Sequence, residues 1–213
     1  MDPNQPTGLT KSESRPLLNP ALFAFQAALA LLIFAFGFRL AAAESVPTLS
    51  DLVVSNPEGE RIRPFQTASN RFVVFIFIRN DCPISNHYSP AARALEKRFA
   101  ARGIAFWLVH PGRDETAASI RKHAAEYGLT LPILLDPDHQ LVKLAQATVT
   151  PEAAVFDRNA RLVYHGRIDD QYVDFGRMRP EARDKTLEKN LELLLAGKPL
   201  PSSAAKAIGC YIE

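Results

Sequence analysis

The sequence RFVVFIFIRNDCPISNH, at residues 71–87, decides the fold. Its first half, Arg71–Ile78, is a run of β-branched and aromatic residues without polar alternation. Continuous apolarity of this kind predicts a strand that is buried on both faces, as in a parallel α/β sheet. Cys82 and Pro83 follow a short polar loop, and proline suits the first turn of a helix. The stretch therefore predicts a central strand that leads into a helix, with Cys82 just before the helix N-terminus.

This position favours the thiolate form of Cys82. Unpaired backbone N–H groups and the positive end of a helix dipole stabilise an ionised sulfur. Only the thiolate attacks a disulfide or a peroxide efficiently. Arg79 would add positive charge nearby, whereas Asp81 would oppose it. We therefore predict that Cys82 is a reactive thiol rather than a free cysteine that packs as a small hydrophobe.

The rest of the chain alternates between helical and strand patterns. Helices are predicted from Pro83 to Gly103, from a cap at Asp114 to a stop at Gly128, over about 138–146, and from Pro180 to Gly197. Strands are predicted at 104–109, 132–135, 153–156 and 162–164, the last two antiparallel around the turn at 157–160. Residues 47–65 predict a short β-hairpin or a loop before the sheet. The fold class is α/β, with one central mixed sheet flanked by helices on both faces.

Composition narrows the possible classes of protein. The chain has 213 residues, 47% of them hydrophobic, which is enough for one domain with a sizeable core. A net charge of +2 gives no sign of a nucleic-acid partner. Cys82 and Cys210 are the only two cysteines in the sequence, too few for a disulfide framework and too far apart for a zinc site built from cysteines.

The N-terminal residues 1–43 have the pattern of a secretory leader. Lys11 and Arg15 precede the apolar stretch 21–38, and Ala41–Ala43 supplies a small-residue cleavage site. The alternative is an uncleaved anchor, because 18 residues lie at the lower limit for spanning a bilayer. Either way the domain, residues 44–197, and its irregular tail, residues 198–213, are predicted outside the cytoplasm, secreted or periplasmic. Residues 21–38 would be the sole contact with the inner membrane, and only if uncleaved.

Several motifs in this order resemble the thioredoxin-like superfamily. They are the strand–Cys82-Pro83–helix junction and Thr150-Pro151 just before the strand 153–156. Within that superfamily the chain is similar to the redoxin branch, of the alkyl hydroperoxide reductase and thiol-specific antioxidant type. The strings YHGRIDD at 164–170 and IGC at 208–210 resemble those of peroxiredoxin-like bacterial proteins. The resemblance covers about residues 46–213 and implies a thioredoxin-like fold with a peroxiredoxin-type insertion.

The resemblance also implies a function and further site residues. Pro151 would be a cis proline whose loop lies against Cys82 and presents backbone to an extended substrate. The chain would be a thiol–disulfide oxidoreductase that requires no organic cofactor and no metal, and it could also reduce peroxides as an antioxidant. Its partners would be a thiol or disulfide protein, or a peroxide, together with an external thiol reductant.

The sequence departs from the patterns of this superfamily at Ser85, at Arg79 and in the loop upstream, which lacks the proline of typical peroxiredoxins. Ser85 stands where thioredoxins have their second cysteine, so it cannot resolve a mixed disulfide, although its hydroxyl could bond the Cys82 thiolate or cap the helix. Arg79 stands where typical peroxiredoxins have a threonine, which argues against an efficient peroxide pocket. Cys210 in the tail could replace the missing thiol, because closing a long loop costs little additional entropy. It would either resolve an intermediate on Cys82 or form a structural disulfide that anchors the tail.

Two other classes of function stay open. Extracytoplasmic copper chaperones with this topology bind the metal through Cys-x-x-x-Cys and a distant histidine, and Cys82, Cys210 and a histidine would suit Cu(I). Here Asn86 stands at the second cysteine, and the candidate histidines are His87, His110 and His165. The third possibility is a binding module without redox activity, in which Cys82 would not react with thiol reagents.

Overall fold

The computed structural model describes residues 51–66, 70–201 and 205–213. The predicted leader or anchor at residues 1–43 lies outside this part of the chain. Within the described part, no helix combines the length and apolarity needed to cross a membrane.

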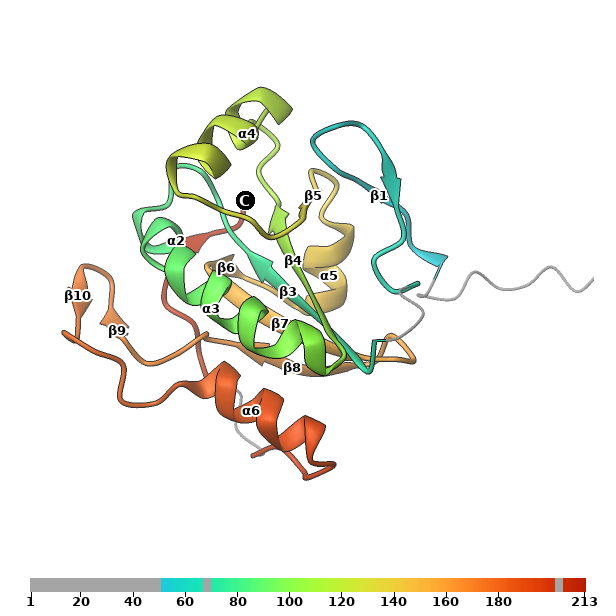
Figure 1. The fold of residues 1–213 in the computed structure, drawn as a ribbon. Coiled ribbons are helices and arrows are strands. Elements are labelled where there is room, and N and C mark those ends of the chain that lie inside the picture. The colour runs from blue at the N-terminus through green and yellow to red at the C-terminus, as the bar shows by residue number, and fades with distance from the viewer. Residues whose placement is uncertain (1–50, 67–69, 202–204) are drawn as a thin grey trace, which may run out of the picture. The chain divides into compact units, whose positions relative to one another are not determined.

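Seven strands form one mixed sheet in the order β2-β1-β5-β4-β3-β7-β8 (Figure 1). They are β1 Val54–Ser55, β2 Arg61–Ile62, β3 Phe72–Phe77, β4 Ile104–His110, β5 Ile133–Leu135, β7 Glu152–Asp157 and β8 Leu162–Gly166. β3, β4 and β5 are parallel, whereas β7 is antiparallel to both of its neighbours, β3 and β8. The predicted strands are confirmed, as is the antiparallel pair around the turn at 157–160. For the segment before the sheet, the hairpin is the alternative that is confirmed within residues 51–65, because β1 pairs antiparallel with β2.

The central strand β3 is buried on both faces, as its continuous apolar sequence predicts. Val74 and Ile76 belong to one core cluster, and Val73, Phe75 and Phe77 to another. Successive side chains of a strand point to opposite faces, so the two clusters lie on the two sides of the sheet. Each fully buried side chain of this size contributes roughly 1.5–3 kcal/mol to the stability of the fold. The strand that leads to Cys82 is therefore firmly held.

Helices cover both faces of the sheet and complete the α/β architecture (Figure 1). They are α2 Pro83–His87, α3 Ser89–Phe99 with the 3₁₀ turn η2 Ala100–Arg102, α4 Ala117–Glu126, α5 Gln140–Ala145 and α6 Thr186–Leu195. Leu95 of α3 and Leu187 of α6 pack in the cluster with Val74, whereas Leu141 of α5 packs in the cluster with Phe75. The predicted fold class is confirmed.

Two predicted helices differ from the observed ones for local reasons, the first in its continuity and the second in its start. The helix after Pro83 is not continuous but breaks at Tyr88, because Pro90 lacks the N–H that a helix interior needs. α4 is capped by Thr116 rather than Asp114: the Thr116 hydroxyl accepts from Ser119 N at 3.1 Å, and the Ser119 hydroxyl accepts from Thr116 N at 3.0 Å. This reciprocal capping box satisfies two backbone donors at once.

The last helix begins later than predicted, at Thr186 instead of Pro180. The carboxylate of Asp170 accepts hydrogen bonds from the backbone N–H groups of Arg183 and Asp184, at 2.7 and 2.8 Å. These contacts hold the preceding segment in an irregular path. Before it, β9 Tyr172–Asp174 and β10 Arg177–Met178 form a small hairpin beside α2 (Figure 1).

The C-terminal tail is not irregular throughout, contrary to the prediction. Its strand β11, Cys210–Tyr211, pairs antiparallel with β6, Val149–Thr150. The pairing places Cys210 opposite Thr150, directly before Pro151. The end of the chain is therefore brought to the same place as the end of β3.

Candidate functional site

Cys82 lies between β3 and α2, where its sequence context predicts it. Its backbone is extended, and it is the N-cap residue of α2. The backbone N–H of Ser85 donates to the Cys82 Sγ at 3.4 Å. Such a donor favours a negatively charged sulfur. The side chain of Cys82 is fully buried, so its immediate neighbours decide what can reach it.

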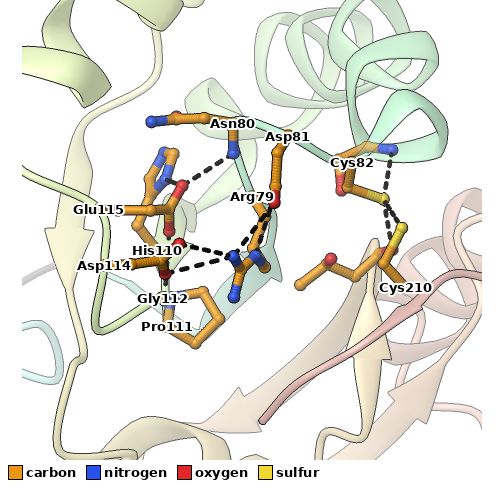
Figure 2. A network of polar contacts seen from close by, with 12 residues as sticks. Arg79, Asn80, Asp81, Cys82, His110, Pro111, Gly112, Asp114, Glu115 and Cys210 are labelled. Carbon is orange, nitrogen blue, oxygen red and sulfur yellow. Dashed lines mark hydrogen bonds and ion pairs between the residues drawn. The ribbon is translucent and has the colours of Figure 1, made fainter.

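The closest of these neighbours is the second cysteine. The Sγ atoms of Cys210 and Cys82 lie 2.7 Å apart, and both thiols are free (Figure 2). In its protonated form Cys82 also donates from Sγ to the backbone oxygen of Thr150, at 3.0 Å. Residues 128 positions apart thus meet at the ends of β3 and β11. This arrangement allows a Cys82–Cys210 disulfide to form without rearrangement of the fold.

The Thr150–Pro151 peptide bond is cis, as the resemblance implies. The loop that carries it also lies against Cys82, through the contact with Thr150. Strand β6 ends in this loop and supplies the backbone edge that pairs with β11. Cys82, Cys210 and Pro151 are thereby brought together at one site.

The two thiols have opposite tendencies to ionise. Burial raises the pKa of Cys82, but contacts with Cys210 and Ser85 outweigh it and lower the pKa below the ordinary value of 9.0. Burial and the neighbouring Cys82 sulfur raise the pKa of Cys210 to about 12. The pair therefore keeps one proton on Cys210, which donates it in a hydrogen bond to a Cys82 thiolate. Of the two sulfurs, Cys82 is thus the one that ionises at the lower pH, and Cys210 is its protonated partner.

We predict that Cys82 ionises below pH 9.0 in the reduced protein. The thiolate fraction grows as the pH rises through the pKa, so a lowered pKa means more thiolate at neutral pH. A titration of the thiolate absorbance in the ultraviolet should show this step. The step should move to higher pH in Cys210→Ala, which lacks the donor, and disappear in Cys82→Ser. A midpoint at or above 9.0 in the native chain would contradict the assignment of Cys82 as the nucleophile.

Ser85 influences Cys82 through both its backbone and its side chain. Its buried hydroxyl makes no hydrogen bond of ordinary geometry within the described residues, yet the side chain is one of the causes that lower the pKa of Cys82, together with the N–H. The alternative that the hydroxyl caps the helix finds no support, because Cys82 itself is the N-cap. Ser85 thus contributes its side chain and the N–H of its position in the first turn to the surroundings of the Cys82 sulfur.

Arg79 is engaged by carboxylates. Its guanidinium Nε lies 3.0 Å from Asp81 Oδ1, and its Nη2 lies 3.2 Å from Asp114 Oδ2 (Figure 2). The hydrogen bond to Asp81 is the main reason why the pKa of Arg79 is raised. In the part of the chain that the structure describes, its polar partners are these carboxylates and not the Cys82 sulfur. Its charge acts on the pair from a distance, because it is one of the causes that lower the pKa of Cys210. Arg79 ties the loop before Cys82 to the segment after β4.

A buried polar network holds the loop that precedes Cys82, and the sequence did not predict it. The Glu115 carboxylate accepts hydrogen bonds from Asn80 N at 2.8 Å and from the His110 ring at 3.1 Å (Figure 2). The His123 ring donates to Asn86 Oδ1 at 2.7 Å, and the Asn86 amide donates in turn to the Asn80 oxygen at 3.2 Å. The segment from β4 to α4 thus holds the loop at both ends. Glu115 and His123 carry no motif, so only the packing of α4 against this loop identifies them.

The histidines considered for a metal site lie apart from the two sulfurs. His110 contacts Glu115, His87 contacts Gln171 at 3.2 Å, and His165 lies 3.5 Å from the Glu152 carboxylate. Asn86 is bound within the loop. In the described ranges, no group of three or more His, Cys, Asp or Glu side chains is placed to hold a metal ion.

Glu152 fixes the backbone of the Pro151 loop. Its buried carboxylate accepts hydrogen bonds from Thr148 N at 2.8 Å and from Val149 N at 3.3 Å. Glu152→Ala leaves both donors without their acceptor and should lower the free energy of unfolding by about 2–4 kcal/mol. Glu152→Gln keeps one acceptor oxygen and should lose less. Urea unfolding of the three chains tests this, and an alanine variant within about 0.5 kcal/mol of the native chain would refute the role.

Residues 46–165 match the AhpC/TSA family. No curated protein matches the chain.

Solved structures share the fold. An uncharacterized conserved protein from Geobacillus kaustophilus is 26% identical, with a TM-score of 0.63 over 76% of this chain and 87% of that one. A hypothetical protein from Sinorhizobium meliloti 1021 is 24% identical, with a TM-score of 0.63 over 76% and 89%. A putative thiol:disulfide interchange protein from Chlorobium tepidum is 16% identical, with a TM-score of 0.51 over 68% and 92%. The predicted thioredoxin-like fold is confirmed.

Proposed function

The chain belongs to the AhpC/TSA family, and from this premise we propose that it is an extracytoplasmic thiol–disulfide oxidoreductase. Cys82 is its attacking thiol and Cys210 is its resolving thiol. The observation that carries the proposal is the 2.7 Å approach of the two sulfurs at the end of the central strand. Membership of the family and the similarity to a structure described as a putative thiol:disulfide interchange protein agree with this chemistry.

The reaction begins on Cys82. Its thiolate attacks one sulfur of a substrate disulfide and forms a mixed disulfide, while the other substrate sulfur leaves as a thiolate and takes a proton from water. Cys210 then loses its proton and attacks the Cys82 sulfur. The Cys82–Cys210 disulfide forms, and the substrate leaves with both sulfurs reduced. The two electrons come from the chain, and an external thiol reductant restores them.

The ionisation of the pair suits this order of events. In the reduced chain the Cys82 sulfur is one cause of the raised pKa of Cys210, next to burial. In the mixed disulfide Cys82 carries no charge and accepts no proton from Cys210, so this cause is removed. The pKa of Cys210 therefore falls once the mixed disulfide has formed, which is the step at which the Cys210 thiolate has to attack. Cys210 is held protonated in the resting state and is activated by the first step.

Reduction of peroxide is the second candidate function, since the AhpC/TSA family takes its name from an alkyl hydroperoxide reductase and a thiol-specific antioxidant. A peroxide would oxidise the Cys82 thiolate to a sulfenic acid, and Cys210 would condense with it to the same disulfide with loss of water. Arg79 stands in place of the usual threonine and its guanidinium is occupied by Asp81 and Asp114, which weighs against an efficient peroxide pocket. We therefore rank disulfide exchange first.

The proposed location rests on the leader. Residues 1–43 combine basic residues, an apolar stretch and a small-residue cleavage site. Disulfides persist in compartments outside the cytoplasm. Such a compartment would supply disulfide-bonded protein substrates, which Cys82 would attack and Cys210 would release. Residues 21–38 would serve as a tether to the inner membrane if the leader stays attached.

Trapping with Cys210→Ser tests the function. The variant should retain mixed disulfides with extracytoplasmic proteins, and Cys82→Ser/Cys210→Ser should retain none. A sulfenic acid on Cys82 after peroxide, without mixed disulfides, would assign the chain to peroxide reduction instead. A Cys82 that reacts with neither class of substrate would support the binding module and overturn the proposal.

A further inference from the structure

The C-terminal strand lies along the backbone edge that adjoins Cys82. Cys210 pairs with Thr150 and Tyr211 with Val149, and Ile212 N donates to the Thr148 oxygen at 3.0 Å. Figure 1 shows β11 next to β6 and close to the start of α2. The tail is therefore bound as an extended peptide in antiparallel pairing.

This bound tail closes the approach to the nucleophile. The Cys82 side chain is fully buried, and its sulfur faces the Thr150 oxygen at 3.0 Å and the Cys210 sulfur at 2.7 Å. A disulfide from another protein has to bring one sulfur to bonding distance of Cys82. The Cys210 sulfur fills that position, so it must leave before a protein substrate can enter.

Gly209 lies against backbone with no room for a side chain. A Cβ atom built on it would lie 2.2 Å from the Thr150 oxygen and 2.6 Å from the Thr150 carbonyl carbon. These are backbone atoms, which cannot turn aside as the end of a flexible side chain can. Any residue other than glycine before the cysteine would therefore lift the peptide away from β6.

The last residues of the tail are held by a short ladder and by the partly buried side chains of Ile208, Cys210 and Ile212, which pack against the two core clusters. The ladder between β11 and β6 is two residues long, and Tyr211 is 78% exposed. Upstream, the Ala205 oxygen accepts from Arg167 N at 2.8 Å, and Ala207 is buried. Segments with short ladders and few buried side chains open at low free-energy cost. The strand can therefore leave β6 while the residues before it stay attached.

We propose that residues 209–212 are an internal substitute for the protein substrate, and that Cys82 reacts with extended segments in which glycine directly precedes the disulfide-bonded cysteine. The inference deepens the proposed function and rests on it. The substrate segment replaces the tail on β6 by adding a strand to a sheet edge. When Cys210 resolves the mixed disulfide, the tail returns to β6 and expels the reduced substrate.

The test uses the full chain with Cys210→Ser, which keeps the tail seated and leaves Cys82 as the one cysteine. The probe is the peptide KAIGCYI, the sequence of residues 206–212, with its cysteine in a mixed disulfide to nitrothiobenzoate. Attack by the Cys82 thiolate on the peptide sulfur joins peptide to protein and releases nitrothiobenzoate, whose absorbance gives the rate. The comparison peptide, KAIACYI, has alanine in place of the glycine.

Displacement of the tail should accelerate the reaction. Adding Gly209→Ala or Ile212→Pro to Cys210→Ser should raise the rate with the glycine peptide about tenfold or more, because the open state becomes the populated one. The exposed Lys206→Ala serves as the matched control and should leave the rate unchanged. In the opened variants the glycine peptide should react about tenfold or more faster than the alanine peptide, because only glycine fits against Thr150.

The outcomes separate the inference from the function on which it rests. Equal rates for the two peptides, or a rate unaffected by both opening substitutions, would overturn the inference while Cys82 still reacts with a small aromatic disulfide. A Cys82 that fails to react with the small disulfide as well would overturn the proposed function. Ile212→Pro removes only one N–H donor near the chain end, so it tests the tail even if Gly209→Ala disturbs folding.

Discussion

Replacing Cys82 by serine is expected to lower the rate of disulfide exchange by about three orders of magnitude or more, as loss of a covalent nucleophile does in other enzymes. A serine hydroxyl does not ionise at neutral pH and cannot attack sulfur in its place. Cys210 is not expected to take over, because burial still raises its pKa and the Ser85 N–H donates to position 82 rather than to Cys210. The rate is measured as reduction of a disulfide-linked fluorescent peptide in the presence of an external thiol reductant.

The serine variant needs a control for folding, because the Cys82 side chain is fully buried. Its thermal unfolding should stay cooperative, and Cys82→Ala should show the same loss of rate with a different effect on stability. A Cys82→Ser chain that keeps more than about a tenth of the native rate would show that another group carries the chemistry.

Replacing Cys210 by serine is expected to separate the first step from turnover. The first attack by Cys82 persists, but the intermediate has no thiol at the 2.7 Å position that Cys210 occupies. An intramolecular thiol acts at a high effective concentration, so turnover that depends on an external thiol should fall about a hundredfold. Mass spectrometry should find the substrate bound covalently to Cys82.

Lys206→Ala provides the matched comparison for this variant, because it changes an exposed residue in the same tail. It should turn over at the native rate and accumulate no mixed disulfide. Native turnover by Cys210→Ser would mean that the second thiol only anchors the tail. The role of a resolving thiol would then pass to the external reductant.

The features that local sequence determines could be predicted. The apolar run of β3 and the Cys82-Pro83 junction are properties of neighbouring residues, so they identified the central strand and the position of Cys82 before α2. The turn at 157–160 likewise fixed an antiparallel pair. Resemblance to a family added the cis bond before Pro151, which no local pattern establishes.

The features that depend on distant contacts could not be predicted in the same way. The late start of α6 follows from the Asp170 carboxylate binding the backbone of residues 183 and 184. Strand β11 has two residues and therefore no periodicity to detect, and it exists because β6 offers a partner. The contact of Cys82 with Cys210 was a hypothesis from the sequence, and the fold supplies the distance that supports it.

Peptide mapping of the oxidised, full-length chain tests the central claim most directly. Equimolar disulfide substrate is added to the reduced chain, remaining thiols are blocked in acid, and proteolytic peptides are compared with and without reduction. The account predicts one peptide pair, linked by a disulfide between Cys82 and Cys210 within a single chain, together with two thiols on the released substrate. Two blocked thiols on the chain after exposure to the substrate, or disulfides formed only between chains, would contradict it.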